Sequence, residues 1–106
     1  MKQMWRVGAG VLLALGLSAC SFIEVSESAE AVKLATYDEV THCKKLGFTR
    51  TQVLSKIGFI ERNEQTMTAE LADLARNEAV AMGGDTIVPQ APVEDGKMVF
   101  DIYRCR

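Results

Sequence analysis

The most reactive side chains in this sequence are three cysteines and its single histidine, namely Cys20, Cys43, Cys105 and His42. Two thiols can join as a disulfide, thiolates and an imidazole together can bind zinc, and a thiolate beside an imidazole can act as a nucleophile. Which chemistry is available depends on the segment that holds each cysteine. The segment that ends at Cys20 differs in kind from the other two.

Residues 1–19 have the composition of a secretory signal peptide. Lys2 and Arg6 make its start positive, residues 7–17 are almost wholly Val, Leu, Ala and Gly, and small residues precede Cys20. These are the three parts of a cleaved export signal. The apolar run is too short to cross a bilayer, which takes roughly 20 residues.

The end of this leader, Leu17-Ser18-Ala19-Cys20, resembles the lipobox of bacterial lipoproteins. The resemblance implies that the leader is cut before Cys20 and that the Cys20 thiol takes a diacylglycerol, which makes membrane lipid the first expected partner. Ser21, rather than Asp, after the cysteine implies sorting to the outer membrane. We therefore expect an outer-membrane, lipid-anchored protein whose domain faces the periplasm.

Removal of the leader leaves 87 of the 106 residues, enough for one domain with a small core. It also removes two of the 12 Lys and Arg, so that 10 remain against 14 Asp and Glu. An acidic chain without a basic cluster argues against nucleic acid as a partner. Residues 20–31 are rich in Ser and Glu, and we expect the lipidated cysteine and a short solvated tether there.

If lipid takes Cys20, the remaining cysteines form an even pair in an oxidising compartment. We predict a disulfide between Cys43 and Cys105, closing a loop that the chain-entropy argument values at about 4 kcal/mol. Two alternatives stay open: a pair of free thiols, or a metal site that includes His42. The metal site lacks a fourth ligand and a Cys-x-x-Cys spacing, so no metal and no cofactor are expected.

A helix over about residues 64–82 is the clearest predicted element. Asn63 suits the N-cap position, and Gly83 and Gly84 supply a stop where positive φ is tolerated. Apolar residues recur at three- and four-residue spacing and form one stripe, which must be buried against another element. The stripe consists of Met67, Leu71, Leu74, Ala75, Ala79 and Met82.

Residues 32–106 form the expected domain. Outside the helix, their sequence pattern predicts strands near residues 32–34, 46–54, 86–88 and 98–105. We expect a turn or single helical turn at residues 37–39, a loop or bent strand end at Gly58 and a tight turn at Asp95-Gly96. In the last strand, Met98, Phe100 and Ile102 share the face toward the helix. The expected fold is α+β: a small antiparallel or mixed sheet of about four strands packed on one main helix, with one disulfide.

Several segments together resemble a family of small bacterial lipoproteins known as a domain of unknown function. A helix that ends in Gly-Gly-Asp before a short apolar strand is also distantly similar to RcsF, an outer-membrane lipoprotein that senses envelope stress, and to YbjQ-like domains. This sequence has one available cysteine pair where RcsF has two disulfides, and it lacks the Pro-rich linker of RcsF. The segments are Cys43-Lys44-Lys45-Leu46-Gly47, Gly58-Phe59-Ile60-Glu61-Arg62-Asn63, Ala75-Arg76-Asn77-Glu78-Ala79, Met82-Gly83-Gly84-Asp85-Thr86-Ile87-Val88-Pro89 and Tyr103-Arg104-Cys105.

An enzyme is not expected, because the sequence contains no Gly-x-Ser-x-Gly, phosphate-loop or His-Glu-x-x-His motif. On a strand, His42 and Cys43 would point to opposite faces, which would separate the imidazole from the thiol. The acids Glu61, Glu64 and Glu78 are interpreted as solvated surface. We expect a non-catalytic envelope lipoprotein that binds another envelope protein, in stress sensing or envelope maintenance. The alternative is a periplasmic module for a small ligand or metal, held by His42 and the cysteines or in a pocket beneath the Gly83-Gly84 turn.

Overall fold

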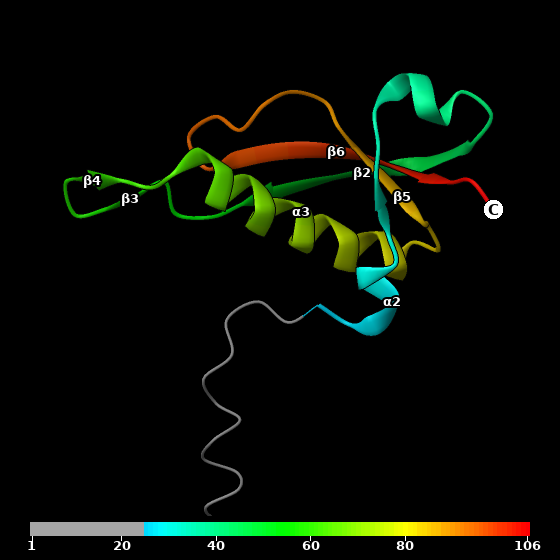
Figure 1. The fold of residues 1–106 in the computed structure, drawn as a ribbon, viewed down its shortest axis with the longest axis horizontal. Helices are drawn as coiled ribbons and strands as arrows, with labels where there is room; N and C mark the ends of the chain where they lie inside the picture. Colours follow the sequence, from blue (N-terminus) through cyan, green and yellow to red (C-terminus); the bar gives the residue numbers. More distant parts are fainter. Residues whose placement is uncertain (1–24) are drawn as a thin grey trace, which may run out of the picture.

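The computed structural model describes residues 25–106, so the expected leader, Cys20 and residues 20–24 of the expected tether lie outside this part. A four-stranded sheet has the order β1-β5-β6-β2, and a separate two-stranded hairpin is formed by β3 and β4. The sheet packs on one long helix, α3, so the expected α+β class is confirmed (Figure 1). The elements in chain order are α2 (Glu27–Glu30), β1 (Lys33–Leu34), the 3-10 helix η2 (Tyr37–Val40), β2 (Lys44–Gln52), β3 (Lys56–Ile57), β4 (Ile60–Glu61), α3 (Glu64–Ala81), β5 (Thr86–Pro89) and β6 (Lys97–Arg104).

Helix α3 begins at a polar cap and buries its apolar stripe, as the sequence predicts. The Asn63 side chain accepts hydrogen bonds from the amides of Gln65 and Thr66. Five residues of the helix are buried, and Leu74 and Met82 of the predicted stripe lie at its partly buried margin. The buried residues are Met67, Leu71, Ala72, Ala75 and Ala79.

Strand β6 lies inside the sheet and supplies much of the core. Met98, Phe100 and Ile102 point toward α3 and are buried with Leu71 in the main core, because alternate residues of a strand share a face. β6 pairs antiparallel with β2 on one side and with β5 on the other. β1 adds to β5 in parallel, which makes the sheet mixed. A second, smaller core of Ala35, Val40 and Val88 also holds Cys43, Tyr103 and Cys105 at its margin.

Part of the expected tether is folded onto the domain. Ser26 caps α2 by accepting a hydrogen bond from the amide of Ala29, and Ala29 is fully buried where α2 contacts α3. A small side chain at this position lets the two helices approach closely. The structure therefore adds residues 26–31 to the packed domain, and less chain is left between the domain and Cys20 than the composition suggests.

The segment around Gly58 forms a complete hairpin rather than a loop or a bent strand end. Lys56 pairs with Glu61 and Ile57 pairs with Ile60, with Gly58 at a φ of +64° in the turn. This hairpin projects from the body of the domain beyond the start of α3 (Figure 1). At the second predicted turn, Asp95 and Gly96 both have positive φ, at +52° and +71°, which is the geometry of a tight Asp-Gly turn.

Candidate functional site

Cys43 and Cys105 form the predicted disulfide, which joins the start of β2 to the end of β6. Both sulfur-bearing side chains pack at the margin of the smaller core, on the face of the sheet opposite α3. The chain beyond β6 is held by Asp85, whose carboxylate accepts hydrogen bonds from the amides of Cys105 (2.9 Å) and Arg106 (3.1 Å). Burial raises the pKa of Asp85, but these two amides, the Thr86 hydroxyl and the Arg106 charge outweigh it and hold the pKa below its usual value.

His42 and Cys43 lie in the turn that follows η2 and not on a strand, so the expectation that they point to opposite faces is wrong. The His42 Nε2 atom lies 3.9 Å from the Cys43 sulfur, and the histidine is exposed. The sulfur is already bonded to Cys105, so it is not available as a thiolate nucleophile or metal ligand. Within residues 25–106, no three His, Cys, Asp or Glu side chains gather as a metal site would require.

At the Gly83-Gly84 turn, beneath which the alternative hypothesis places a pocket, Gly84 packs directly against β6. A Cβ atom at Gly84 would lie 2.6 Å from Cγ2 of Ile102 and 3.0 Å from the carbonyl oxygen of Tyr103. The two glycines have different structural roles. Gly83 ends the helix with a φ of +81°, and Gly84, which has no Cβ, lets the chain pass directly against β6.

The acids Glu61, Glu64 and Glu78 are all exposed. Glu61 and Glu64 line one cavity of about 460 Å³ together with Glu94 and Asp95, and Glu78 does not line it. Glu64 and Glu78 stand at opposite ends of α3, about 21 Å apart along the helix axis. Glu61 lies across from Lys56 on the β3–β4 hairpin.

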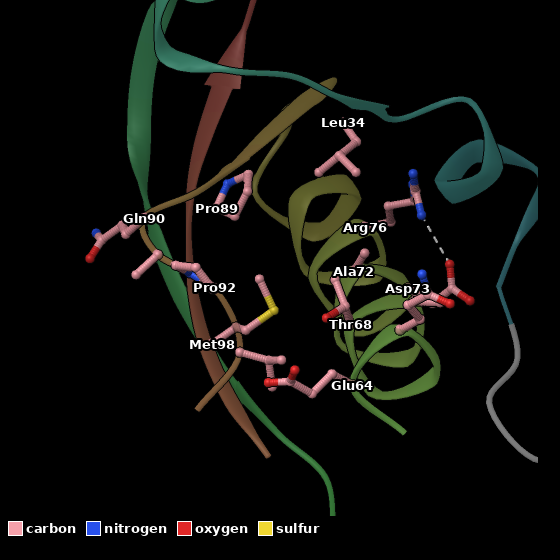
Figure 2. Close-up of a pocket in the computed structure, with 14 residues that line it drawn as sticks. Leu34, Glu64, Thr68, Ala72, Asp73, Arg76, Pro89, Gln90, Pro92 and Met98 are labelled. Atoms are coloured by element: carbon pink, nitrogen blue, oxygen red, sulfur yellow. Dashed lines mark hydrogen bonds and ion pairs between the residues drawn. The ribbon is translucent and has the colours of Figure 1, made fainter. Parts of the chain in front are cut away.

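The main concave feature is a groove of about 880 Å³ between α3 and the segment that follows β5 (Figure 2). Thr68, Ala69 and Ala72 line its helical side, and their small side chains let the groove come close to the helix backbone. Met98 of β6 reaches the groove between the two walls. The opposite wall is the extended, proline-containing segment Pro89, Gln90, Ala91, Pro92 and Val93, with the half-exposed Leu34 of β1 at one end. Eight of the 14 lining residues are apolar, and the charged ones are Glu64, Asp73 and Arg76 of α3.

Arg76 closes the end of the groove that lies nearest the N-terminal segment. Its Nη1 donates to the Asp73 carboxylate at 3.1 Å, and its Nε donates to the carbonyl oxygen of Val32 at 3.1 Å. The Asp73 and Arg76 side chains also line a small cavity with Val25 and Glu30. The groove and this small cavity therefore share Asp73 and Arg76 as lining residues.

The wall opposite the helix carries open backbone groups. The amide of Gln90 donates to Val99 and the amide of Glu94 donates to Lys97, but within residues 25–106 the amides of Ala91 and Val93 make no backbone hydrogen bond. Unpaired amides on an extended segment can pair with a second extended chain. The Gln90 side chain itself points away from the groove (Figure 2).

The Gln90 side chain reaches a buried carboxylate, Asp101, on the opposite face of the sheet. Asp101 is 4% exposed. It accepts hydrogen bonds from the Tyr37 hydroxyl (2.7 Å) and from the side-chain amide Nε2 of Gln90 (2.9 Å). Burial raises the pKa of Asp101, but these two hydrogen bonds and the nearby charge of Lys45 outweigh it, so the pKa lies below its usual value. Desolvation, and then the hydrogen bond to Asp101, raise the pKa of Tyr37 to about 12. Because each carboxylate oxygen of Asp101 accepts a hydrogen bond from a neighbouring side chain, we assign the cluster to stability.

The fold and the groove define a small, single-disulfide α+β domain with an open, largely apolar groove. A family comparison assigns the sequence further: residues 23–105 match the family described as a domain of unknown function (DUF4156), and the chain belongs to this family. Comparisons with curated proteins and with solved structures find no match. Within residues 25–106, no helix is long and apolar enough to cross a membrane.

Proposed function

We propose that this chain is a non-catalytic, lipid-anchored protein of the outer membrane whose domain faces the periplasm and binds another envelope protein. The export leader and the lipobox-like Leu17-Ser18-Ala19-Cys20 support the anchor. The distant similarity to RcsF supports a role in envelope stress sensing or maintenance. The groove between α3 and residues 89–93 is the observation that carries the binding function.

The occupant that fits this groove best is an extended, largely apolar segment of the partner protein. Alanines and a threonine on the helix leave room for side chains, and Pro89 and Pro92 keep the opposite wall extended. The open amides of Ala91 and Val93 can donate hydrogen bonds to the partner's carbonyl groups. Such backbone pairing provides affinity, while the apolar lining selects side chains.

Two features support a binding role over catalysis. The disulfide consumes the only cysteines of the described part, and His42 stands exposed beside it. The buried carboxylate of Asp101 is held ionised by its own hydrogen-bond donors, so it is poorly suited to take up a proton near neutral pH.

Photo-crosslinking in intact cells tests the proposal. A photoreactive amino acid at Ala69 and another at Ala91 would stand on opposite walls of the groove, and one at Glu78 would stand on an exposed part of the same helix outside it. We expect the same protein, identified by mass spectrometry, to be captured from both walls and not from Glu78. Adducts with only lipid or abundant porins, or equal capture from Glu78, would refute binding through the groove.

A small apolar ligand is the second candidate, because the groove volume of about 880 Å³ falls within the range of small-molecule sites. In that case no protein would be captured at Ala69 or Ala91, and lipid extraction of the purified protein would release a stoichiometric compound. A metal ligand set from His42 and the cysteines would require the disulfide to be reduced. Calorimetry with Zn²⁺ on reduced and oxidised protein separates that possibility.

A further inference from the structure

The β3–β4 hairpin and the residues leading into it expose more large apolar side chains than any other part of the described chain. Leu54, Ile57 and Ile60 are each at least 66% exposed, and Phe59 at the tip is fully exposed. A contiguous exposed apolar patch marks an interaction surface, since single exposed apolar residues are common but clusters are not.

Hydrogen bonds hold the hairpin at its base, and its tip projects away from the body of the domain (Figure 1). The Arg62 amide donates to the Ser55 carbonyl at 2.9 Å, and the Arg62 guanidinium donates to the Leu54 carbonyl at 3.1 Å. The same guanidinium forms two 2.9 Å hydrogen bonds to the Glu70 carboxylate on α3. An isolated two-stranded hairpin is marginally stable, and these contacts tie it to the helix.

Charge changes sharply along the hairpin. The tip, Ile57-Gly58-Phe59-Ile60, carries no charged side chain, while Lys56 and Glu61 face each other across the ladder immediately below it. An apolar end followed by one pair of opposite charges matches the change from acyl chains to zwitterionic headgroups across a membrane interface. No charged group of the tip would have to leave water on insertion.

We propose that this tip, with Phe59 foremost, inserts into the interface of the bilayer that holds the acylated Cys20. This rests on the anchor of the proposed function. Four residues, Ser21 to Glu24, separate the anchor at Cys20 from the first described residue, Val25, and the five steps from Cys20 to Val25 span at most about 17 Å. The domain therefore stays within reach of the bilayer. Lipid is favoured over a protein partner because the apolar side chains project from a narrow protrusion, which fluid acyl chains surround without a preformed pocket.

A single-tryptophan experiment tests the insertion. Trp5, in the leader, is the only tryptophan of the chain. In a Trp5→Phe background, Phe59→Trp places one reporter at the tip, and Phe48→Trp places a matched reporter on β2, where Phe48 is 52% exposed. Protein isolated from cells that express the full chain is mixed with vesicles of phosphatidylethanolamine and phosphatidylglycerol, with and without brominated acyl chains.

We expect the Phe59→Trp emission to move to shorter wavelength and to be quenched by brominated lipid, and the Phe48→Trp emission to change in neither way. Adding Ile60→Asp to Phe59→Trp should abolish the quenching, because a charge would then have to enter the acyl region. Absence of quenching at Phe59→Trp, or equal quenching at both positions, would overturn the proposal. The anchor is tested separately, by membrane fractionation of the Cys20→Ser chain. The quenching measurement tests only whether the hairpin tip enters the bilayer, so the two failures can be distinguished.

Discussion

Breaking the Cys43–Cys105 disulfide should remove a large share of the domain's stability. The bond joins residues 62 positions apart, and the loop-closure entropy for that separation corresponds to about 4 kcal/mol at 25 °C. The folded state has little reason to change, because Asp85 still holds the amides of Cys105 and Arg106 when the sulfurs separate. A domain of this size has a total stability of about 5–15 kcal/mol, so the loss brings it close to unfolding.

Urea unfolding, followed by far-UV circular dichroism of α3, measures this loss. Residues 20–106 with Cys20→Ser are compared with the same chain carrying Cys43→Ala and Cys105→Ala. With a denaturant slope of about 1–2 kcal/mol/M for a small domain, the midpoint should fall by roughly 2–4 M. Both chains are also measured with dithiothreitol. The reductant should lower the urea midpoint of the disulfide-bonded chain and leave that of the double alanine chain unchanged.

A loss below about 1 kcal/mol would refute the loop-closure reasoning. It would mean that the unfolded chain already keeps the two segments close, so that the covalent bond removes few conformations. A large loss of unfolding free energy together with a changed denaturant slope would mean that removing the disulfide changes the compactness of the unfolded chain.

Three further predictions concern the core, the acid response and the anchor. Leu71→Ala should lower the free energy of unfolding by about 2–5 kcal/mol, because Leu71 is fully buried in the main core; urea unfolding measures it, and a loss below 1 kcal/mol would contradict this packing. Because the folded pKa of Asp101 lies below its usual value, its ionisation stabilises the domain above about pH 4, and that stability is lost as the pH falls through the folded pKa. Asp101→Asn, and more weakly Tyr37→Phe, should flatten the decline of the urea midpoint between neutral pH and about pH 3; an unchanged acid response would contradict this assignment. Cys20→Ser should abolish lipid attachment and membrane fractionation, and a variant that still sediments with membranes would refute the anchor.

The elements that depend on local pattern could be predicted from the sequence. Asn63 and Gly83 bound the helix because capping chemistry is local, and the alternation from Met98 to Ile102 fixes the inward face of β6. The cysteine count predicted the disulfide once Cys20 was set aside.

The groove and the buried carboxylate could not be predicted, because both depend on which distant segments meet. Pro89 and Pro92 suggest an extended segment, but nothing local says that this segment passes beside Ala69 and Ala72. Asp101 lies on the face expected for it, yet its burial requires Tyr37, 64 positions away in the sequence. Periodicity also assigns apolar residues to a core, and Phe59 contradicts that rule by standing fully in solvent.

Arg76 connects the N-terminal segment both to α3 and to the groove. Two contacts join the N-terminal segment to α3. Ala29 packs against the helix, and the Arg76 guanidinium donates a hydrogen bond to the Val32 carbonyl at 3.1 Å. The same side chain closes one end of the groove. An occupant that displaced the Arg76 side chain from the groove would therefore also break the hydrogen bond that joins Val32 to α3.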